Sequence, residues 1–593
     1  MCKIESYFLD PDKLKTALTG YHPRSTQIKA AELIDNAFRN YQDIVIEAPT
    51  GSGKTMAYLI PAFDQGKRAI ISTKTKQLMQ QLYLKDMPVM RAVFGDCSVA
   101  VIKGKKNYFC PHRFMRWIYP NSVYYQDVIE WYQSVEGDVK ELPTAFFDAG
   151  ILDKMSADSH QCIYAKCQFF QKCPFYAAKD AANAAQVVIT NHYLLLTDVA
   201  VMAADGQGTT IDPAEHIIFD EAHSIADIYA MFAGAEISLR RLTNTLADYK
   251  EKLPFEKLRQ LPEIQEAIRD ITGDGKAEYE KVREKAAVFI DICRELVEMA
   301  KESDLKNEFG RWETSFATLN GDKEGLRFAE QRGRDVLLKY VPLEPDGSFI
   351  DGLGKISLSS LFISATLSSN GSFDYFLRET GLDGDKLTIA SLPNVFEIHR
   401  QAKLFVPDMR KKNRDAVMLE LIKGVRGSVL IICNSLKRMT ELIDFISSVQ
   451  SEKTVFSQKD GDWSTFVSNE NIVLIGCASL REGIDLAGGD FRCVIIDKLP
   501  FEYPHDLYLS MKSRRIEEET GNAFANYNLP RAALYFKQAV GRLIRHESDR
   551  GICAVFDDRI LTKSYGKIFL NVLDSITITD SVQEALYFLN IEQ

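Results

Sequence analysis

The chain has 593 residues, of which 46% are hydrophobic and 26% are charged, the balance of a globular protein with several domain cores. Its formal net charge of -10 argues against a uniformly basic nucleic-acid-binding surface but leaves room for a local basic groove. No apolar run is long enough to span a bilayer, and residues 1–10 lack a signal-peptide pattern. We therefore expect a cytoplasmic protein whose 11 cysteines serve as thiols or metal ligands.

A phosphate-binding loop is predicted near the start of the chain, between an apolar run at 44–46 and a helix-forming run at 56–60. Its residues are Ala48, Pro49, Thr50, Gly51, Ser52, Gly53, Lys54 and Thr55. The glycines let successive backbone N–H groups point at phosphate oxygens. We expect Lys54 to reach the β- and γ-phosphates of ATP and the Thr55 hydroxyl to bind Mg²⁺. The strict pattern has glycine at the position of Ala48.

Polar residues flank this unit on both sides. Gln27 precedes an amphipathic helix expected over Ile28–Phe38, and its amide can read an adenine edge, although an ordinary helix start also explains it. Downstream, the strand at 68–72 runs into a loop at 73–78 that is rich in threonine and lysine. Such side chains at the carboxyl end of a strand suit a nucleic-acid backbone, and a solvated helix start is the alternative.

The stretch Lys103–Cys110 combines lysines, a glycine, two aromatic residues and a cysteine. Lysines that track phosphates and rings that stack on bases are typical of single-stranded nucleic-acid binding. The alternative is a solvated basic loop beside a Tyr108 and Phe109 that belong to the core.

Four cysteines gather in the segment that interrupts the α/β pattern: Cys110, Cys162, Cys167 and Cys173. The last three are separated by four and five residues, and Pro174 follows directly. Four thiolates favour an iron–sulfur cluster, here [4Fe–4S], while the paired two-residue spacings of structural zinc are missing. Buried cysteines without a ligand are the alternative.

The α/β pattern resumes with a strand at 186–190, and a second apolar strand at 216–219 ends in Asp220, Glu221, Ala222 and His223. A carboxylate at the end of an apolar strand suits Mg²⁺ beside a phosphate-binding loop, so Asp220 is predicted to be the carboxylate that binds Mg²⁺. We expect Glu221 to position or deprotonate the attacking water and His223 to sense the nucleotide state.

Residues 237–326 change to charged, helix-forming sequence, for example over Ala277–Arg283 and Val288–Ala300, which predicts a mainly helical insertion. A strand at 361–363 follows, with Ser364 and Thr366 directly after it. Two hydroxyls at that position can couple the nucleotide site to a neighbouring domain.

A second α/β region contains strands at 428–433, 472–476 and 493–497 but no second phosphate-binding loop. A helix over 538–545 would place Gln538, Arg542 and Arg545 on one face. Two arginines on one face suit an arginine finger that completes the ATP site from the opposite domain, whereas a surface salt-bridge face is the alternative.

Together these motifs resemble the iron–sulfur DNA helicases of superfamily 2, the XPD-like group, and most closely the bacterial DinG-type helicases. The matching residues extend from Tyr21 to Arg559 and include 499–501 with Pro504. The resemblance adds Asp485 to the nucleotide-binding residues. Arg481 stands where members of the family often carry an aromatic residue, and residues 432–435 match their motif loosely.

The resemblance implies an α/β fold with two RecA-like motor domains. The first motor domain would comprise 1–104, 186–236 and 351–400, interrupted by an iron–sulfur cluster domain at 105–185 and a helical arch at 237–350, and the second would comprise 401–593. It also implies ATP-driven 5′→3′ translocation on single-stranded DNA and unwinding at duplex junctions, in repair or replication. We expect a monomer whose protein partners are single-strand-binding or replication proteins. An RNA or RNA–DNA hybrid translocase with structural zinc, and an ATP-gated clamp without unwinding, are the alternatives.

Overall fold

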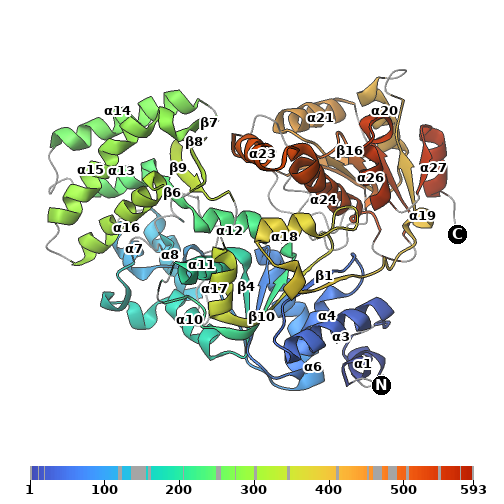
Figure 1. The fold of residues 1–593 in the computed structure, drawn as a ribbon, viewed down its shortest axis with the longest axis horizontal. Helices are drawn as coiled ribbons and strands as arrows, with labels where there is room; N and C mark the ends of the chain where they lie inside the picture. Colours follow the sequence, from blue (N-terminus) through green and yellow to red (C-terminus); the bar gives the residue numbers. More distant parts are fainter. Residues whose placement is uncertain are drawn as a thin grey trace.

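The structure is a computed structural model. It describes residues 3–10, 13–18, 20–117, 123–134, 152, 155–157, 162–204, 206, 208–248, 255–273, 275–299, 303–322, 324–343, 347–408, 413–449, 453–458, 471–477, 491–501, 507–544, 546, 549–573 and 576–590. Figure 1 shows an α/β domain that carries the N-terminus, a second α/β domain that carries the C-terminus, and a mainly helical insertion at the far end.

A parallel sheet of seven strands, in the order β11-β1-β10-β5-β2-β4-β3, forms the centre of the first domain. Its strands are β1 (Ile44–Glu47), β2 (Ala69–Thr73), β3 (Val99–Val101), β4 (Val187–Asn191), β5 (Ala214–Asp220), β10 (Ser357–Ser364) and β11 (Thr388–Ser391). Strands β1, β2 and β4 are buried throughout, as expected for parallel strands with helices on both faces. All carboxyl ends therefore meet at one edge, where the phosphate-binding loop follows β1 and Asp220 ends β5.

Helices cover both faces of this sheet because side chains alternate along each strand. Ile44 and Ile46 pack in one core, whereas Val45 packs in the core on the other face. On the first face lie α1 (Lys3–Leu9), α2 (Leu14–Ala17), α3 (Ser25–Arg39), α4 (Lys54–Asp64), α5 (Lys76–Gln81), the π-helical turn η1 (Leu82–Asp86) and α6 (Met87–Phe94). The remaining helices of the domain are α10 (Pro174–Ala184), α11 (His192–Ala203), η5 (Ala222–Ser224), α12 (Ile225–Ala233), α17 (Ser348–Ile356), α18 (Asp374–Thr380) and η7 (Gly384–Lys386). Helix α19 (Ile398–Gln401) belongs to the second domain, because Ile398 packs against the core of that domain.

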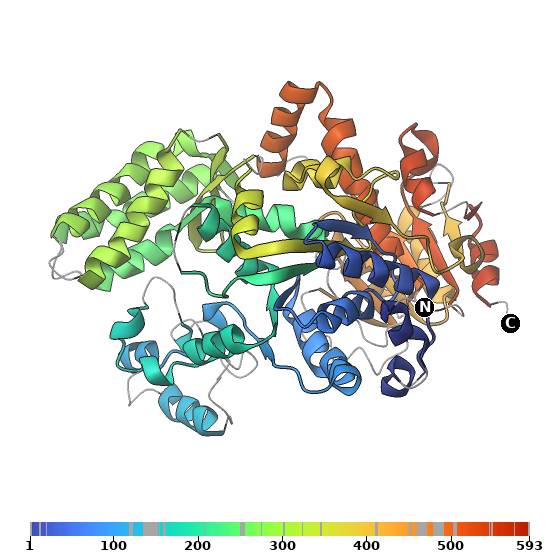
Figure 2. The ribbon, with the colours of Figure 1, turned by 60° about the horizontal axis from the view of Figure 1, so that its bottom comes forward.

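The cysteine-bearing segment leaves the first domain after β3 and returns through α10, and Figure 2 shows it as a separate small lobe. Its described elements are η2 (Lys105–Asn107), α7 (Pro111–Trp117), α8 (Val123–Ser134), η3 (Tyr164–Lys166) and η4 (Phe170–Lys172). Its core is aromatic, because Phe109 and Phe114 pack against Val128 and Met155.

The insertion is mainly helical, as predicted, but it also contains a four-stranded antiparallel sheet that the sequence analysis missed, in the order β6-β9-β8-β7. Its elements are β6 (Ala235–Ser238), α13 (Leu239–Asp248), α14 (Phe255–Thr272), β7 (Lys276–Glu278), η6 (Tyr279–Lys281), α15 (Arg283–Met299), α16 (Ser303–Asn320), β8 (Leu326–Arg332) and β9 (Asp335–Val341). The helical prediction for Ala277–Arg283 was wrong, since Ala277 pairs with Ala329 in the sheet and the helix begins only at Arg283.

The second domain repeats the architecture of the first, with a seven-stranded parallel sheet in the order β14-β15-β13-β16-β17-β12-β18. Its strands are β12 (Ala402–Phe405), β13 (Ser428–Ile432), β14 (Thr454–Ser457), β15 (Ile472–Gly476), β16 (Phe491–Ile496), β17 (Gly551–Val555) and β18 (Thr577–Thr579). Its helices are α20 (Arg414–Gly424), α21 (Leu436–Ser448), α23 (Leu507–Thr520), the π-helical turn η9 (Phe524–Asn528), α24 (Leu529–Val540), α25 (Arg559–Thr562), α26 (Gly566–Val572) and α27 (Val582–Asn590). The three strands predicted here are confirmed.

The predicted helix over 538–545 was wrong in its extent. Helix α24 ends at Val540, with Gly541 as its C-cap, and Arg542 lies in the following turn, where its N–H donates to Ala539 O at 3.2 Å. Glycine in a helix costs about 1 kcal/mol relative to alanine, which favours an ending there. Arg542 therefore lies just beyond the helix that was predicted to carry it together with Gln538.

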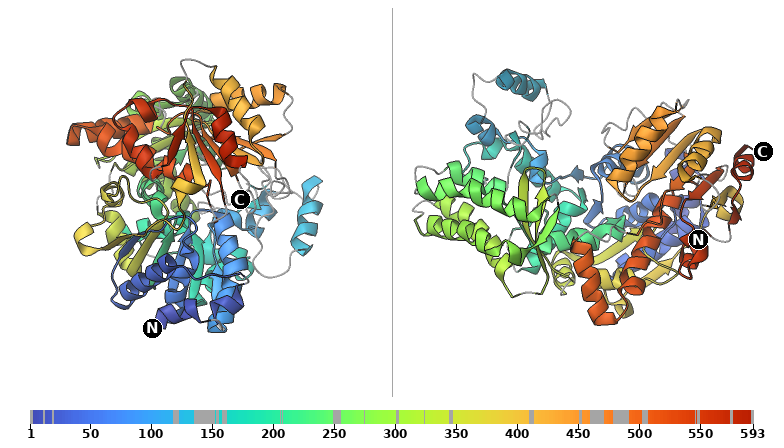
Figure 3. Two further views of the ribbon diagram at one scale, coloured as in Figure 1. Left: turned by 90° about the vertical axis from the view of Figure 1, so that its right-hand side faces the viewer. Right: turned by 90° about the horizontal axis from the view of Figure 1, so that it is seen from above.

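The two α/β domains lie one above the other in the left panel of Figure 3, and the insertion lies beside both in the right panel. The second domain touches the insertion through α23, where Leu507, Tyr508 and Met511 pack against Leu326 and Phe328. Within the described ranges, no helix combines the length and the apolar character needed to cross a bilayer.

Candidate nucleotide-binding site

A cleft of about 900 Å³ lies between the two α/β domains. The first domain contributes Lys54, Thr55, Asp220, Glu221 and His223 to its walls, together with Pro49, Thr50, Gly51 and Gly53. The second domain contributes Lys537, Gln538, Gly541 and Arg542. Residues predicted from motifs far apart in the sequence thus meet in one space.

The phosphate-binding loop has the backbone that its glycines predict. Gly51 and Gly53 both adopt φ = 77°, a conformation that side chains with a Cβ rarely take. A Cβ on Gly53 would also lie 2.1 Å from Gln27 Nε2. The loop leads directly into α4, of which Lys54 is the first residue, so the helix N-terminus and the Lys54 ammonium face the cleft.

Gln27 supports this loop from behind and does not line the cleft. Its Nε2 donates to Gly53 O at 2.9 Å, and its Oε1 accepts from the Tyr21 hydroxyl at 2.6 Å. Its contact with adenine therefore stays a prediction. Arg24, which the sequence analysis did not select, donates to Gly51 O and lines the cleft.

Ala48 and Ser52 are buried and lie outside the cleft walls. The Ala48 N–H donates to Ser364 O at 2.9 Å, which joins the start of the loop to the end of β10. The nucleotide contacts of Ala48 and Ser52 therefore stay a prediction.

Asp220 lies at the end of β5, and one of its two side-chain oxygens accepts a hydrogen bond. Its Oδ2 accepts from the Tyr58 hydroxyl at 3.2 Å, while Oδ1 is buried and has no hydrogen-bond partner among the described residues. Burial, and next the charge of Glu221, raise the pKa of Asp220 to about 7. A buried carboxylate oxygen without a partner among the described residues, on a residue that lines the same cleft as Thr55, fits an oxygen-seeking Mg²⁺.

Three groups contact the Glu221 carboxylate at the carboxyl ends of the paired strands β5 and β10. Its Oε1 lies 3.8 Å from Lys54 Nζ, and its Oε2 accepts from Ser364 Oγ at 2.9 Å and lies 3.3 Å from His223 Nδ1. Burial alone would raise the pKa of Glu221, but the Lys54 ammonium and the His223 hydrogen bond outweigh it and hold that pKa below its usual range. Its φ of 60° is strained for a residue with a side chain, which is common at functional sites.

The hydroxyls after β10 join the nucleotide site to the second domain, as the sequence predicted. Ser364 Oγ bridges Glu221 and His223, and Thr366 Oγ1 accepts from Gln538 Nε2 at 3.1 Å. Of the second-domain residues predicted here, Gln538 and Arg542 reach the cleft, whereas Arg545 and Asp485 lie outside the described residues.

The sequence analysis missed an ion pair that joins the two domains in the same cleft. Glu47 ends β1, accepts from the N–H groups of Leu367 and Ser368 at 2.7 and 2.6 Å, and lies 2.8 Å from Lys537 Nζ. An apolar strand that ends in glutamate directly before a phosphate-binding loop was the available signal, but nothing in the sequence pointed to Lys537 as its partner.

The four predicted cluster ligands line one small cavity of about 30 Å³. The 3₁₀ turns η3 and η4 precede Cys167 and Cys173, and Cys110 N donates to Met155 O at 2.7 Å. Burial, and then the neighbouring Cys162 and Cys167, raise the pKa of Cys173. Four thiols around a mostly apolar cavity fit a thiolate-bound cluster, but among the described residues no three side chains are close enough to hold a metal ion.

The stacking role predicted for two aromatic residues of Lys103–Cys110 was wrong. Tyr108 and Phe109 are buried, since Tyr108 packs against Phe175 and Phe109 against Phe114. The alternative interpretation, a basic loop beside core aromatic residues, is the one the structure supports.

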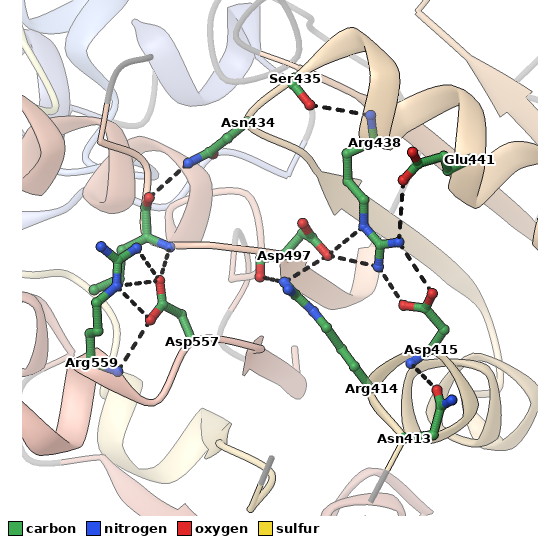
Figure 4. Close-up of polar contacts among 11 residues, drawn as sticks. Asn413, Arg414, Asp415, Asn434, Ser435, Arg438, Glu441, Asp497, Asp557 and Arg559 are labelled. Atoms are coloured by element: carbon green, nitrogen blue, oxygen red, sulfur yellow. Dashed lines mark hydrogen bonds and ion pairs between the residues drawn. The ribbon is translucent and has the colours of Figure 1, made fainter. Parts of the chain in front are cut away.

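A second cavity, of about 740 Å³, lies at the carboxyl edge of the second sheet. Figure 4 shows Arg414 and Arg438 pointing at Asp497 from the starts of α20 and α21. Asp497 is 1% exposed, and its Oδ1 lies 2.8 Å from Arg414 and 3.3 Å from Arg438. Arg438 also pairs with Asp415, so the charges near Asp497 are matched.

Comparison with known proteins agrees with this geometry. Residues 24–107 match the sequence model of DEAD/DEAH box helicases, residues 104–242 match DEAD_2, and residues 418–576 match the helicase C-terminal domain. A solved structure titled XPD helicase superposes with a TM-score of 0.61 at 18% identity, covering 95% of this chain and 100% of that one, which shows a shared fold.

Curated relatives cover nearly the whole chain. "ATP-dependent DNA helicase DinG" of Photobacterium profundum is 25% identical over 95% of this chain and 96% of its own length. "ATP-dependent DNA helicase YoaA" of Escherichia coli (strain K12) is 30% identical over 98% of this chain and 99% of its own length. With the phosphate-binding loop, the Asp220–His223 motif and the second-domain residues in one interdomain cleft, the chain belongs to the YoaA and DinG family of ATP-dependent DNA helicases.

Proposed function

We propose that this ATP-hydrolysing DNA helicase translocates 5′→3′ on single-stranded DNA and unwinds duplexes during repair or replication. The observation that carries the ATP chemistry is the buried Oδ1 of Asp220, which has no hydrogen-bond partner among the described residues. Asp220 lines a cleft that has Lys54 and Thr55 on the same wall and Gln538 and Arg542 on the other. The 5′→3′ direction is supported by the resemblance to the family, not by a distance in the structure.

The residues of the cleft divide the hydrolysis between them. Lys54 and the loop N–H groups would bind the phosphates, and Thr55 with Asp220 would hold Mg²⁺, which neutralises phosphate charge. Glu221 is ionised because its pKa is lowered, so its carboxylate can orient the attacking water or take a proton from it. Arg542 and Arg545 would stabilise the charge that develops on the γ-phosphate.

The single strand would cross the carboxyl edges of both sheets. On the first sheet, Lys76 is exposed at the start of α5, and on the second, Lys437 and Lys498 are exposed at the rim of the 740 Å³ cavity. Phosphate contacts of this kind position a strand without reading its sequence. The interdomain contact of Thr366 with Gln538 would change as the cleft closes and reopens, which would move one sheet along the strand relative to the other.

An unwinding assay tests this function with duplexes that carry a 5′ or a 3′ single-stranded tail of DNA or RNA. We expect ATP-dependent displacement from the 5′-tailed DNA, and none with Lys54→Ala. Displacement from the 3′ tail alone would contradict the polarity. Preference for an RNA tail would favour the RNA translocase, and DNA-stimulated ATP hydrolysis without displacement would favour the clamp.

We further propose that Cys110, Cys162, Cys167 and Cys173 hold a [4Fe–4S] cluster. The support is their common cavity and the chemistry of four thiols. Anaerobically purified protein should be brown, with about four iron and four sulfide per chain. A colourless, zinc-loaded protein that unwinds DNA would contradict the cluster.

Cys162→Ser tests whether the cysteine centre serves strand separation or ATP hydrolysis. We expect the variant to lose iron and unwinding but to keep most of its basal ATP hydrolysis, since none of the cleft residues lies in this segment. Cys97→Ser, which changes a cysteine outside the cavity, is the matched control. Full unwinding by Cys162→Ser would contradict a mechanical role.

A further inference from the structure

Helix α24 of the second domain is attached to the first domain at both ends. Near its start, Arg531 Nη1 lies 2.9 Å from Asp227 Oδ2 and donates to Oδ1 at 3.1 Å. Asp227 belongs to α12, which begins directly after the Asp220–His223 motif. The Arg531 side chain is 13% exposed and the Asp227 side chain 33%, so this ion pair is partly withdrawn from solvent. In Figure 1, α12 and α18 lie between the insertion and α24.

Aromatic rings and a second ion pair surround the Arg531 contact. The Arg531 guanidinium lies 5.8 Å from the Tyr527 ring and 5.4 Å from the Tyr535 ring. Beside it, Lys512 of α23 pairs with Glu379 of α18, with side-chain exposures of 8% and 9%. Two cations of the second domain thus pair with two carboxylates of the first. The Lys512–Glu379 pair is buried and the Arg531–Asp227 pair is partly buried, and a buried pair broken on one side is costly.

Near its end, α24 meets the strand that precedes the phosphate-binding loop. Lys537 lies 2.8 Å from Glu47 Oε1, and Gln538 donates to Thr366. Arg531 and Gln538 are seven positions apart, which corresponds to about 10 Å along a helix. Contacts at two points this far apart fix both the tilt of a helix and its rotation, whereas either contact alone would leave a pivot.

From this arrangement we propose that Arg531 and Asp227 are positioning residues for ATP hydrolysis. Their ion pair holds α24 against the helix that follows Glu221, so that Gln538 and the turn bearing Arg542 face the phosphates. Arg531 lines a small space that His223 and Thr366 also border, but not the nucleotide cleft itself. The pair therefore acts on the reaction through the second-domain residues rather than by contact with ATP.

This inference rests on the proposed ATP hydrolysis and makes a specific kinetic prediction. Misplacing a catalytic group by about 1 Å costs on the order of 10²-fold in rate. Arg531→Ala should therefore lower kcat at saturating ATP and DNA by about 10²-fold. The KM for ATP should change by less than about three-fold, because the phosphate-binding loop is untouched.

The test measures kcat, KM for ATP and melting temperature for Arg531→Ala, Asp227→Ala and the double variant. The double variant should be no slower than the single ones, because both remove the same contact. Arg514→Ala is the matched control, since Arg514 lies on the exposed face of α23 in a pair with Glu518. If Arg531→Ala does not fold, Asp227→Asn, which keeps the side-chain volume, should show the same loss of kcat.

The outcomes separate this inference from the function on which it rests. Wild-type protein that does not hydrolyse ATP would contradict the proposed function. Active wild type, with folded Arg531→Ala or Asp227→Asn at full kcat, would overturn the positioning role alone, as would losses that multiply in the double variant. A melting temperature that falls while kcat is kept would show a purely structural ion pair and would likewise overturn it.

Discussion

The two seven-stranded sheets carry a buried aspartate at corresponding places and use it differently. Asp220 ends β5 of the first sheet, and one of its side-chain oxygens has no partner among the described residues. Asp497 directly follows β16 of the second sheet, and two arginines surround it. An unsatisfied buried carboxylate is expensive to keep, so its presence marks a ligand site, whereas the matched one is structural. The first sheet, which carries the phosphate-binding loop, is therefore the one that supplies the carboxylate for ATP hydrolysis.

The largest expected effect comes from Lys54→Ala, which removes a phosphate-binding charge from the first sheet. DNA-stimulated ATP hydrolysis should fall on the order of 10³-fold or more, with the melting temperature nearly unchanged. Lys67→Ala, an exposed lysine in the connection after α4, is the control and should behave as wild type. Near-normal turnover in a folded Lys54→Ala protein would refute the phosphate-binding assignment.

Arg545→Ala should rank next. If Arg545 acts as an arginine finger, turnover at saturating ATP should fall by about 10³-fold, while ATP affinity changes little. Arg542→Ala, whose side chain does line the cleft, provides the comparison. A loss of affinity without a loss of saturated turnover would assign Arg545 to ground-state binding or to the surface.

Asp497→Ala should act on stability. The substitution leaves Arg414 and Arg438 without their shared carboxylate, and breaking a buried ion pair from one side costs about 3–5 kcal/mol. Denaturant unfolding measures the loss, and Glu441→Ala, at the exposed end of the same network, should cost far less. Equal losses for the two variants would mean that the burial of Asp497 contributes nothing.

Asp220→Asn should have the smallest and opposite effect on stability. The pKa of Asp220 is raised from 3.8 to about 7, so between those pH values the unfolded chain is ionised while the folded protein holds the proton. Stability of the wild type therefore falls as pH rises through this window. In metal-free protein above pH 7, Asp220→Asn should be more stable by about 1–3 kcal/mol, and the difference should vanish towards pH 4. A difference that does not depend on pH would contradict the raised pKa.

The parts of the site that could be predicted are those in which chemistry and local structure share one stretch of sequence. Residues 48–55 and 220–223 each follow an apolar strand, and parallel strands bring their carboxyl ends together without further information. The contact of Lys537 with Glu47 could not be predicted, because 490 positions separate them and only the packing of the domains joins them.

Errors arose where a local pattern competed with a stronger local or tertiary signal. The prediction that residues 538, 542 and 545 share one helix face required a helix that continues through Gly541, but the helix ends at Val540. Charged sequence concealed β7 to β9, although the two-residue connection Gly333–Arg334, with φ = 61° at Gly333, is a hairpin signal that could have been recognised. The pattern predicts that Tyr108 and Phe109 stack on bases, but aromatic residues are equally common in protein cores, where both of these lie.

The comparison of the two aspartates is tested most directly by measuring ATP turnover and melting temperature on the same preparations of Asp220→Asn and Asp497→Asn. We expect the effects to cross. Asp220→Asn should lose DNA-stimulated turnover and melt at or above the wild-type temperature, and Asp497→Asn should melt lower but keep basal turnover while folded. If Asp497→Asn abolishes turnover in folded protein and Asp220→Asn keeps it, the ATP chemistry does not belong to the first sheet.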